Sequence, residues 1–128
     1  MSDDTEKFQV VFDTATAALL KQNAKSARSV DNACYYRHPD AELRCAIGHL
    51  LSDDQMEKYH VNEGDSPSSF DDTLLAEILP GVHYIAAAEF LSSLQRAHDN
   101  ANHSDFRNSF IETANVVACQ YGLNPIKL

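Results

Sequence analysis

Apolar residues recur along most of the chain at the spacing that places them on one face of an α-helix. This spacing predicts helices over residues 3–25, 71–79, 82–99 and 104–121. Aspartate or serine stands at the start of each of these segments except 82–99 and serves as an N-cap candidate, and Gly122 stands where a left-handed C-cap is expected. In the first helix the predicted core positions are Phe8, Phe12, Ala15 and Leu19. In the segment 82–99 the predicted apolar face carries Tyr84, Ala87, Ala88, Leu91, Leu94 and His98.

The segment between the first two of these helices carries shorter patterns. Aromatic residues at 34–37, a turn at His38-Pro39-Asp40 and a second short run at 43–45 predict a small β-hairpin. Residues 46–51 are apolar but too few for periodicity to distinguish a helical turn from a strand end. Ser52 with Gln55 forms a capping-box pattern that predicts a short helix through Tyr59, followed by a loop over 61–69.

Together these elements predict a mainly α fold: a single compact domain, residues 1–128, of four to five helices with one small β-hairpin. Apolar residues make up 44% of the 128 residues and charged residues 23%, which is ordinary for a globular protein. The acidic start Met1-Ser2-Asp3-Asp4 does not resemble a secretory signal. The sequence contains no run of 18 apolar residues, so we expect no membrane span. With three cysteines, an odd number, we expect a cytoplasmic protein with free thiols.

The net charge of −9 is concentrated in one stretch, residues 53–72, which we call the acidic segment. Seven acids and one base give it a charge of −6. Such a segment is either a solvated loop flanked by helix starts, where aspartate is favoured, or a surface that binds a basic partner. A chain this acidic is a poor candidate for direct binding of nucleic acid or anionic membranes. The acids are Asp53, Asp54, Glu57, Glu63, Asp65, Asp71 and Asp72.

Cys34, Cys45 and His49 are the best candidates for metal ligands, since zinc prefers thiolate and imidazole. However, no C-x-x-C spacing is present, and cysteine is among the residues most often buried. We therefore interpret the two cysteines as packed thiols and expect neither a metal nor a cofactor.

The block Leu94-Gln95-Arg96-Ala97-His98-Asp99 carries polar groups beside the apolar face of its helix. The His98-Asp99 pair lacks the further ligands of a metal-dependent phosphohydrolase. We expect His98 to be buried, to bond a backbone group outside its own helix, and to face away from Asp99, which a helix turns by about 100°. A second interpretation joins Arg37, Cys45, His49, Gln95, His98 and Asp99 into a small-ligand site.

Two blocks resemble a family of small phage, prophage and mobile-element proteins. Residues 34–54 are similar to its pattern C-x-Y-R, a turn and C-A-x-G-x-L-I before an acidic pair, and residues 94–99 match L-Q-x-x-H-D. The closing Tyr121-Gly122-Leu123 also fits, but Ala41 and Glu42 stand where the family pattern has a glycine turn. The resemblance implies a mobile-element origin and no particular activity.

We therefore expect a non-enzymatic protein-interaction or accessory protein of a mobile genetic element, of a counter-defence or immunity-like kind. It would bind a protein partner through the acidic segment. The alternative is a small enzyme or ligand-binding protein that uses the Arg37 to Asp99 set named above.

Overall fold

The computed structural model describes residues 3–23, 36, 44–62, 67–101 and 104–126. Within these ranges the chain forms six α-helices and one 3₁₀ helix, and none of the residues is in a strand. The protein is therefore mainly α, as the hydrophobic pattern predicts.

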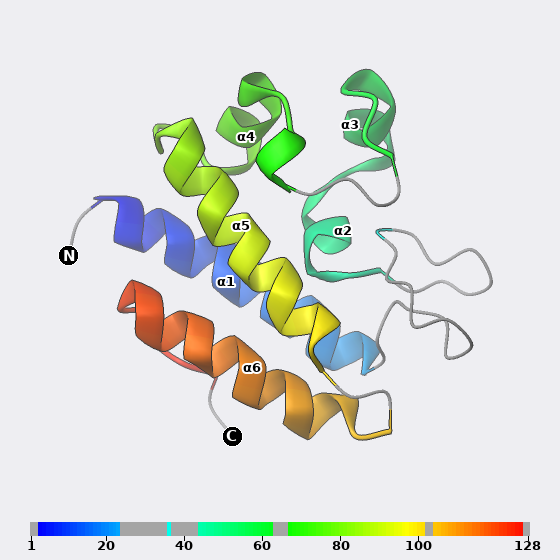
Figure 1. Cartoon of the computed structure of the whole chain (residues 1–128), viewed down its shortest axis with the longest axis vertical. Coiled ribbons are helices and arrows are strands. Elements are labelled where there is room, and N and C mark those ends of the chain that lie inside the picture. The colour runs from blue at the N-terminus through cyan, green and yellow to red at the C-terminus, as the bar shows by residue number, and fades with distance from the viewer. Residues whose placement is uncertain (1–2, 24–35, 37–43, 63–66, 102–103, 127–128) are drawn as a thin grey trace.

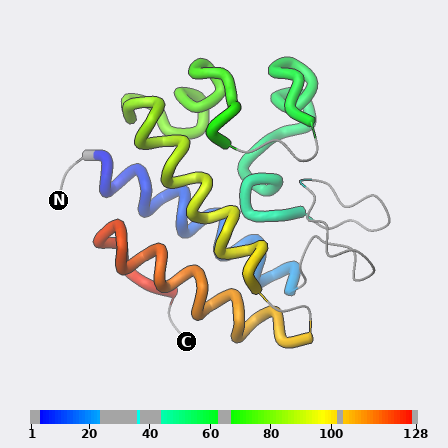
Figure 2. The backbone as a smooth tube through the Cα atoms, viewed as in Figure 1, coloured from blue at the N-terminus to red at the C-terminus, as the bar shows by residue number. Residues whose placement is uncertain are grey.

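Three long helices form most of the structure. α1 (Asp3–Gln22) and α5 (Tyr84–Asp99) run in the same general direction, and α6 (Phe106–Tyr121) runs back beside α5 in the opposite direction (Figures 1 and 2). α6 contacts both of the other long helices. The expected apolar face of α1 is buried in the core. Burial of each phenylalanine or leucine side chain on this face stabilises the fold by about 1.5–3 kcal/mol.

The ends of the long helices follow from single residues. α1 ends at Gln22, earlier than predicted, because Asn23 adopts a left-handed conformation with φ 52° and its N–H bonds the carbonyl of Leu19. α5 begins at Tyr84 because the His83 ring nitrogen Nδ1 accepts a hydrogen bond from the Ile85 amide and caps the helix. α6 ends as predicted, at Gly122 in the left-handed conformation.

Four short elements connect α1 to α5. They are α2 (Ala46–Leu50), α3 (Asp53–Lys58), the 3₁₀ helix η1 (Pro67–Ser69) and α4 (Asp72–Ile78). α2 packs against α1 and α5, whereas η1 and α4 pack against α5 (Figure 1). α3 and α4 lie together at one end of the molecule (Figure 1).

Side-chain caps begin three of these short helices. Ser52 Oγ accepts from the Gln55 amide at 3.0 Å, and Gln55 Oε1 accepts from the Ser52 amide at 2.9 Å, so the predicted capping box is present. Asp71 caps α4 by accepting from the Thr73 amide at 2.8 Å. Cys45 Sγ caps α2 by accepting from the Gly48 amide at 3.3 Å. These bonds satisfy amides that have no partner within the helix.

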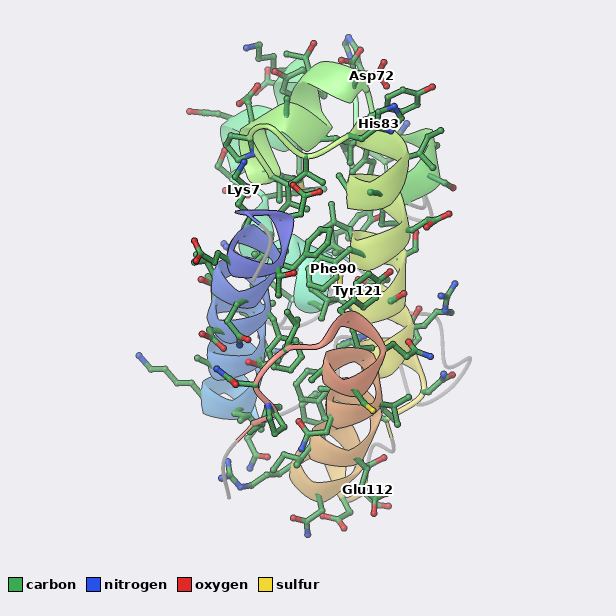
Figure 3. All side chains as sticks on the ribbon, turned by 90° about the vertical axis from the view of Figure 1, so that its left-hand side faces the viewer. Lys7, Asp72, His83, Phe90, Glu112 and Tyr121 are labelled. Atoms are coloured by element: carbon green, nitrogen blue, oxygen red, sulfur yellow. The ribbon has the colours of Figure 1, made fainter. Side chains whose placement is uncertain are left out.

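An aromatic cluster closes one side of the core. The rings of Phe8 and Phe90 stack with centroids 4.4 Å apart, and Tyr121 meets both edge-on at 5.5 and 5.0 Å. Figure 3 shows Phe90 and Tyr121 directed toward each other between α5 and α6. This cluster joins all three long helices, because each ring comes from a different one.

The structure does not support the predicted β-hairpin. Of residues 34–45 only Tyr36, Arg44 and Cys45 are described, and none of them is in a strand; the other positions lie outside the described residues. The ambiguous run after Cys45 is helical, because the Cys45 side chain caps it and Ala46, Ile47 and Leu51 are buried. α2 therefore adds a sixth α-helix to the four or five expected, and η1 occupies part of the expected loop over 61–69.

Candidate functional site

Four residues of the predicted ligand site meet where α2 packs on α5, and we call this group the α2–α5 junction: Cys45, Gln95, His98 and Asp99. Gln95 Oε1 accepts from the Ile47 amide at 3.3 Å, and its Nε2 donates to Asp99 Oδ1 at 3.0 Å. The Cys45 thiol also hydrogen-bonds the Gln95 side chain. Gln95 thus connects the start of α2 to the end of α5.

His98 is fully buried, as expected, but Asp99 does not face away from it. His98 Nδ1 lies 3.0 Å from Asp99 Oδ1, the same oxygen that accepts from Gln95. The Asp99 side chain, 37% exposed, turns back along the helix toward Gln95 one turn earlier, and this brings it to the ring. The expected direction of Asp99 was therefore wrong, since the backbone rotation alone does not fix where a carboxylate points.

Burial governs the chemistry of Cys45. Loss of solvation raises the pKa of its thiol from 9.0 to about 12, and the nearby Asp99 carboxylate adds to the increase. The Gly48 amide and the Gln95 side chain act in the opposite direction but are weaker. The thiol is therefore protonated at neutral pH, whereas a nucleophile or metal ligand has to be a thiolate.

Of the other residues in the predicted ligand site, the structure describes His49, which contacts the end of α1. His49 Nε2 lies 2.9 Å from Gln22 Oε1, and Gln22 also bonds both backbone groups of Arg44, so His49 connects α2 to the end of α1. Arg37 and Cys34 lie outside the described residues. Within the described part of the chain, no three His, Cys, Asp or Glu side chains are grouped as metal ligands would be.

The acidic segment contributes five exposed carboxylates at the end of the molecule formed by α3 and α4. Asp53 and Asp54 lie in the first turn of α3, where acids also favour the helix dipole. Glu63 and Asp65 lie outside the described residues. We call the exposed set the acidic end: Asp53, Asp54, Glu57, Asp71 and Asp72.

Glu77, which lies outside the predicted set, holds the acidic end together. Its carboxylate accepts hydrogen bonds from the Tyr59 hydroxyl and, at 3.2 Å, from Gln55 Nε2. These bonds join α4 to α3, although the residues are about twenty positions apart. Only the folded arrangement shows this connection, because Glu77 reads in the sequence as an ordinary exposed helix residue.

A groove of about 690 Å³, which we call the α4–α5 groove, lies beside the acidic end. Phe70 and Asp72 line one wall, residues of α5 from Tyr84 to Arg96 line the other, and Tyr121 closes it from α6. Tyr84 and Ile85 stay 48% and 51% exposed on its wall. Our sequence interpretation placed Tyr84 on the buried face of α5, but that face is centred on Phe90, Leu94 and their neighbours.

A smaller groove of about 290 Å³, the α5–α6 groove, continues from the first. Both grooves include Ser93 and Arg96, and the smaller one ends beside the exposed Val116 of α6. Neither groove is lined by a residue of the α2–α5 junction. The sequence did not predict the α5–α6 groove, because a single exposed apolar residue such as Val116 is ordinary on a protein surface.

Comparison of the chain with protein-family models, with curated proteins and with solved structures gives no match. Among the described helices, none combines the length and the apolar character that crossing a bilayer requires. The functional proposals therefore depend on the chain's own residues and geometry.

Proposed function

We propose that the protein is a non-enzymatic accessory protein of a mobile genetic element, which binds a basic protein partner through its acidic end. The observation that carries the proposal is that the exposed carboxylates of α3 and α4 lie on two helices held together by Glu77. A fixed array of charges steers an oppositely charged partner and favours one orientation of binding.

The mobile-element origin is supported by the sequence resemblance of the 34–54 and 94–99 blocks. In that setting, an acidic end that occupies the place of nucleic-acid phosphates on a basic host protein is a counter-defence or immunity-like activity. The net charge of −9 supports a basic protein rather than nucleic acid as the direct partner.

The alternative, a small-ligand site, is favoured by one observation: Cys45, Gln95, His98 and Asp99 meet. Their contacts support a structural role more strongly, because the side chains bond one another and the α2 backbone, and Cys45 and His98 are fully buried. The two functions differ in which substitutions abolish binding: those at the acidic end or those at the junction.

Affinity capture from host lysate, followed by mass spectrometry, tests the proposal. We expect reversal of Asp53, Asp54 and Glu57 to lysine to abolish capture of the partner. Reversal of Glu6, Asp13 and Glu112, three exposed acids of α1 and α6, alters the net charge equally and should leave capture largely intact.

Lysine at Asp53 and Asp54 also opposes the α3 dipole, so the variant Asp53→Asn, Asp54→Asn, Glu57→Gln separates charge from folding. It should weaken capture while circular dichroism stays unchanged. Capture that survives both α3 variants contradicts the proposal.

A further inference from the structure

The α4–α5 groove combines exposed apolar side chains with acidic walls. Tyr84 and Ile85 present about half of their surface to solvent at the start of α5, although most apolar side chains in the described residues are buried. Asp72 stands on the α4 side of the groove and Glu89 on the α5 side. An occupant that covers Tyr84 and Ile85 is therefore placed beside two carboxylates.

Small side chains keep the groove open along α5. Ala88 and Ser92 follow Ile85 at helical spacing, and Tyr121 closes the groove from α6. Tyr121 is held by its edge-on contacts with Phe8 and Phe90, so this wall belongs to the rigid core (Figure 3). The wall formed by Tyr121 is therefore ordered before an occupant arrives, so binding carries no entropic cost for ordering this wall.

The length of the groove sets the length of the occupant. From Tyr84 to Arg96, α5 advances by about 18 Å at 1.5 Å per residue, which corresponds to about three turns of a second helix. The charge changes sign along this distance, because Asp72 and Glu89 are acidic and Arg96 is basic.

From these features we infer that the α4–α5 groove binds a basic amphipathic helix of a protein partner. The apolar face of that helix covers Tyr84 and Ile85, and its lysine or arginine residues pair with Asp72 and Glu89. Apolar anchors flanked by complementary charge are the usual means by which a helix is recognised in a groove. The inference rests on the proposed function, since it specifies how the partner of the acidic end is held.

A labelled peptide of about 14 residues, with leucine on one helical face and lysine on the other, is the probe. Fluorescence anisotropy should show binding with a Kd of about 10–100 µM. A peptide with glutamate in place of lysine, and a peptide of scrambled order with the same composition, should each bind at least tenfold more weakly.

Matched variants locate the binding site. Ile85→Ser and Asp72→Lys should each weaken binding of the lysine peptide at least fivefold. Val10→Ser removes an apolar side chain that is 65% exposed on α1, and Glu112→Lys reverses an exposed acid at the opposite end of the molecule from Asp72 (Figure 3); neither should change the affinity.

Absence of peptide binding, equal binding of the glutamate peptide, or an equal effect of Val10→Ser overturns the inference. Self-association of the chain that Ile85→Ser breaks, without peptide binding, overturns it too and assigns the groove to a second copy. The α3 substitutions at Asp53, Asp54 and Glu57 leave the groove unchanged. If they abolish capture of the partner but Ile85→Ser does not, this inference is wrong and the proposed function stands.

Discussion

Cys45 and His98 are both buried in the α2–α5 junction, and each makes different hydrogen bonds there. The thiol caps α2 while protonated, and the imidazole bonds the carboxylate that Gln95 also bonds. Both residues are candidates for chemistry in the sequence, and their contacts in the fold support a structural role. A buried polar group that keeps its partners makes a fold specific, and one that loses them destabilises it.

The raised pKa of Cys45 predicts how stability depends on alkaline pH. Burial raises the pKa of the thiol from 9.0 to about 12, so the folded state holds this proton more tightly than the unfolded state does. The contribution is fully present below about pH 9 and is lost as the pH rises toward 12. Urea unfolding at pH 7, 9 and 10.5 should show a steeper loss for the wild type than for Cys45→Ala. If the free energy of unfolding of both proteins falls equally with pH, the raised pKa of Cys45 is contradicted.

Substitution of His98 separates a structural role from a functional one. His98→Ala leaves a small void and removes a partner of Asp99, so we expect the free energy of unfolding to fall by about 1–3 kcal/mol. His60→Asn is a matched control, because His60 is exposed with φ 54° and asparagine tolerates that conformation. An unchanged stability of His98→Ala, combined with lost partner or ligand binding, would instead assign the junction a functional role.

At the scale of the element, three helix ends were predicted correctly because their signals are local, whereas α1 ends earlier than predicted. The Ser52–Gln55 box, Asp71 before α4 and Gly122 after α6 each act within a few residues of the end that they define. Ser52→Ala should lower the free energy of unfolding by about 0.5–2 kcal/mol in urea denaturation, whereas Ser52→Thr should restore most of it. Equal stability of Ser52→Ala and the wild type would show that the box contributes nothing.

Elements whose form depends on distant contacts were predicted less well. The run from Ala46 to Leu51 has no periodicity of its own, and its helical form goes with the Cys45 cap and with packing on α1 and α5. In the block at 94–99 the expected direction of Asp99 was wrong, and the contact of Gln95 with α2 was not predicted, because it joins residues 48 positions apart. Tyr84 was assigned to the core because its spacing fits the apolar stripe, yet α4 and η1 leave it beside an open groove.

At the scale of the whole molecule, charge and exposed apolar surface occupy neighbouring places. The acidic end lies on α3 and α4, and the α4–α5 groove begins at Asp72, which belongs to both. No short stretch of sequence shows that the two surfaces are neighbours, because the groove is assembled from η1, α4, α5 and α6. A partner that reaches both surfaces gains electrostatic steering from the first and apolar contact from the second.

The most direct test of the central claim is the rate at which the captured partner associates with the chain, measured against ionic strength. Screening shortens the reach of charges, so the wild-type association rate should fall at least tenfold between about 50 and about 500 mM salt. The variant with Asp53, Asp54 and Glu57 reversed should bind slowly, and its association rate should depend little on salt. The variant with Glu6, Asp13 and Glu112 reversed should keep most of the wild-type salt dependence. A wild-type rate that salt does not change, or an α3 variant with the wild-type salt dependence, would contradict binding through the acidic end.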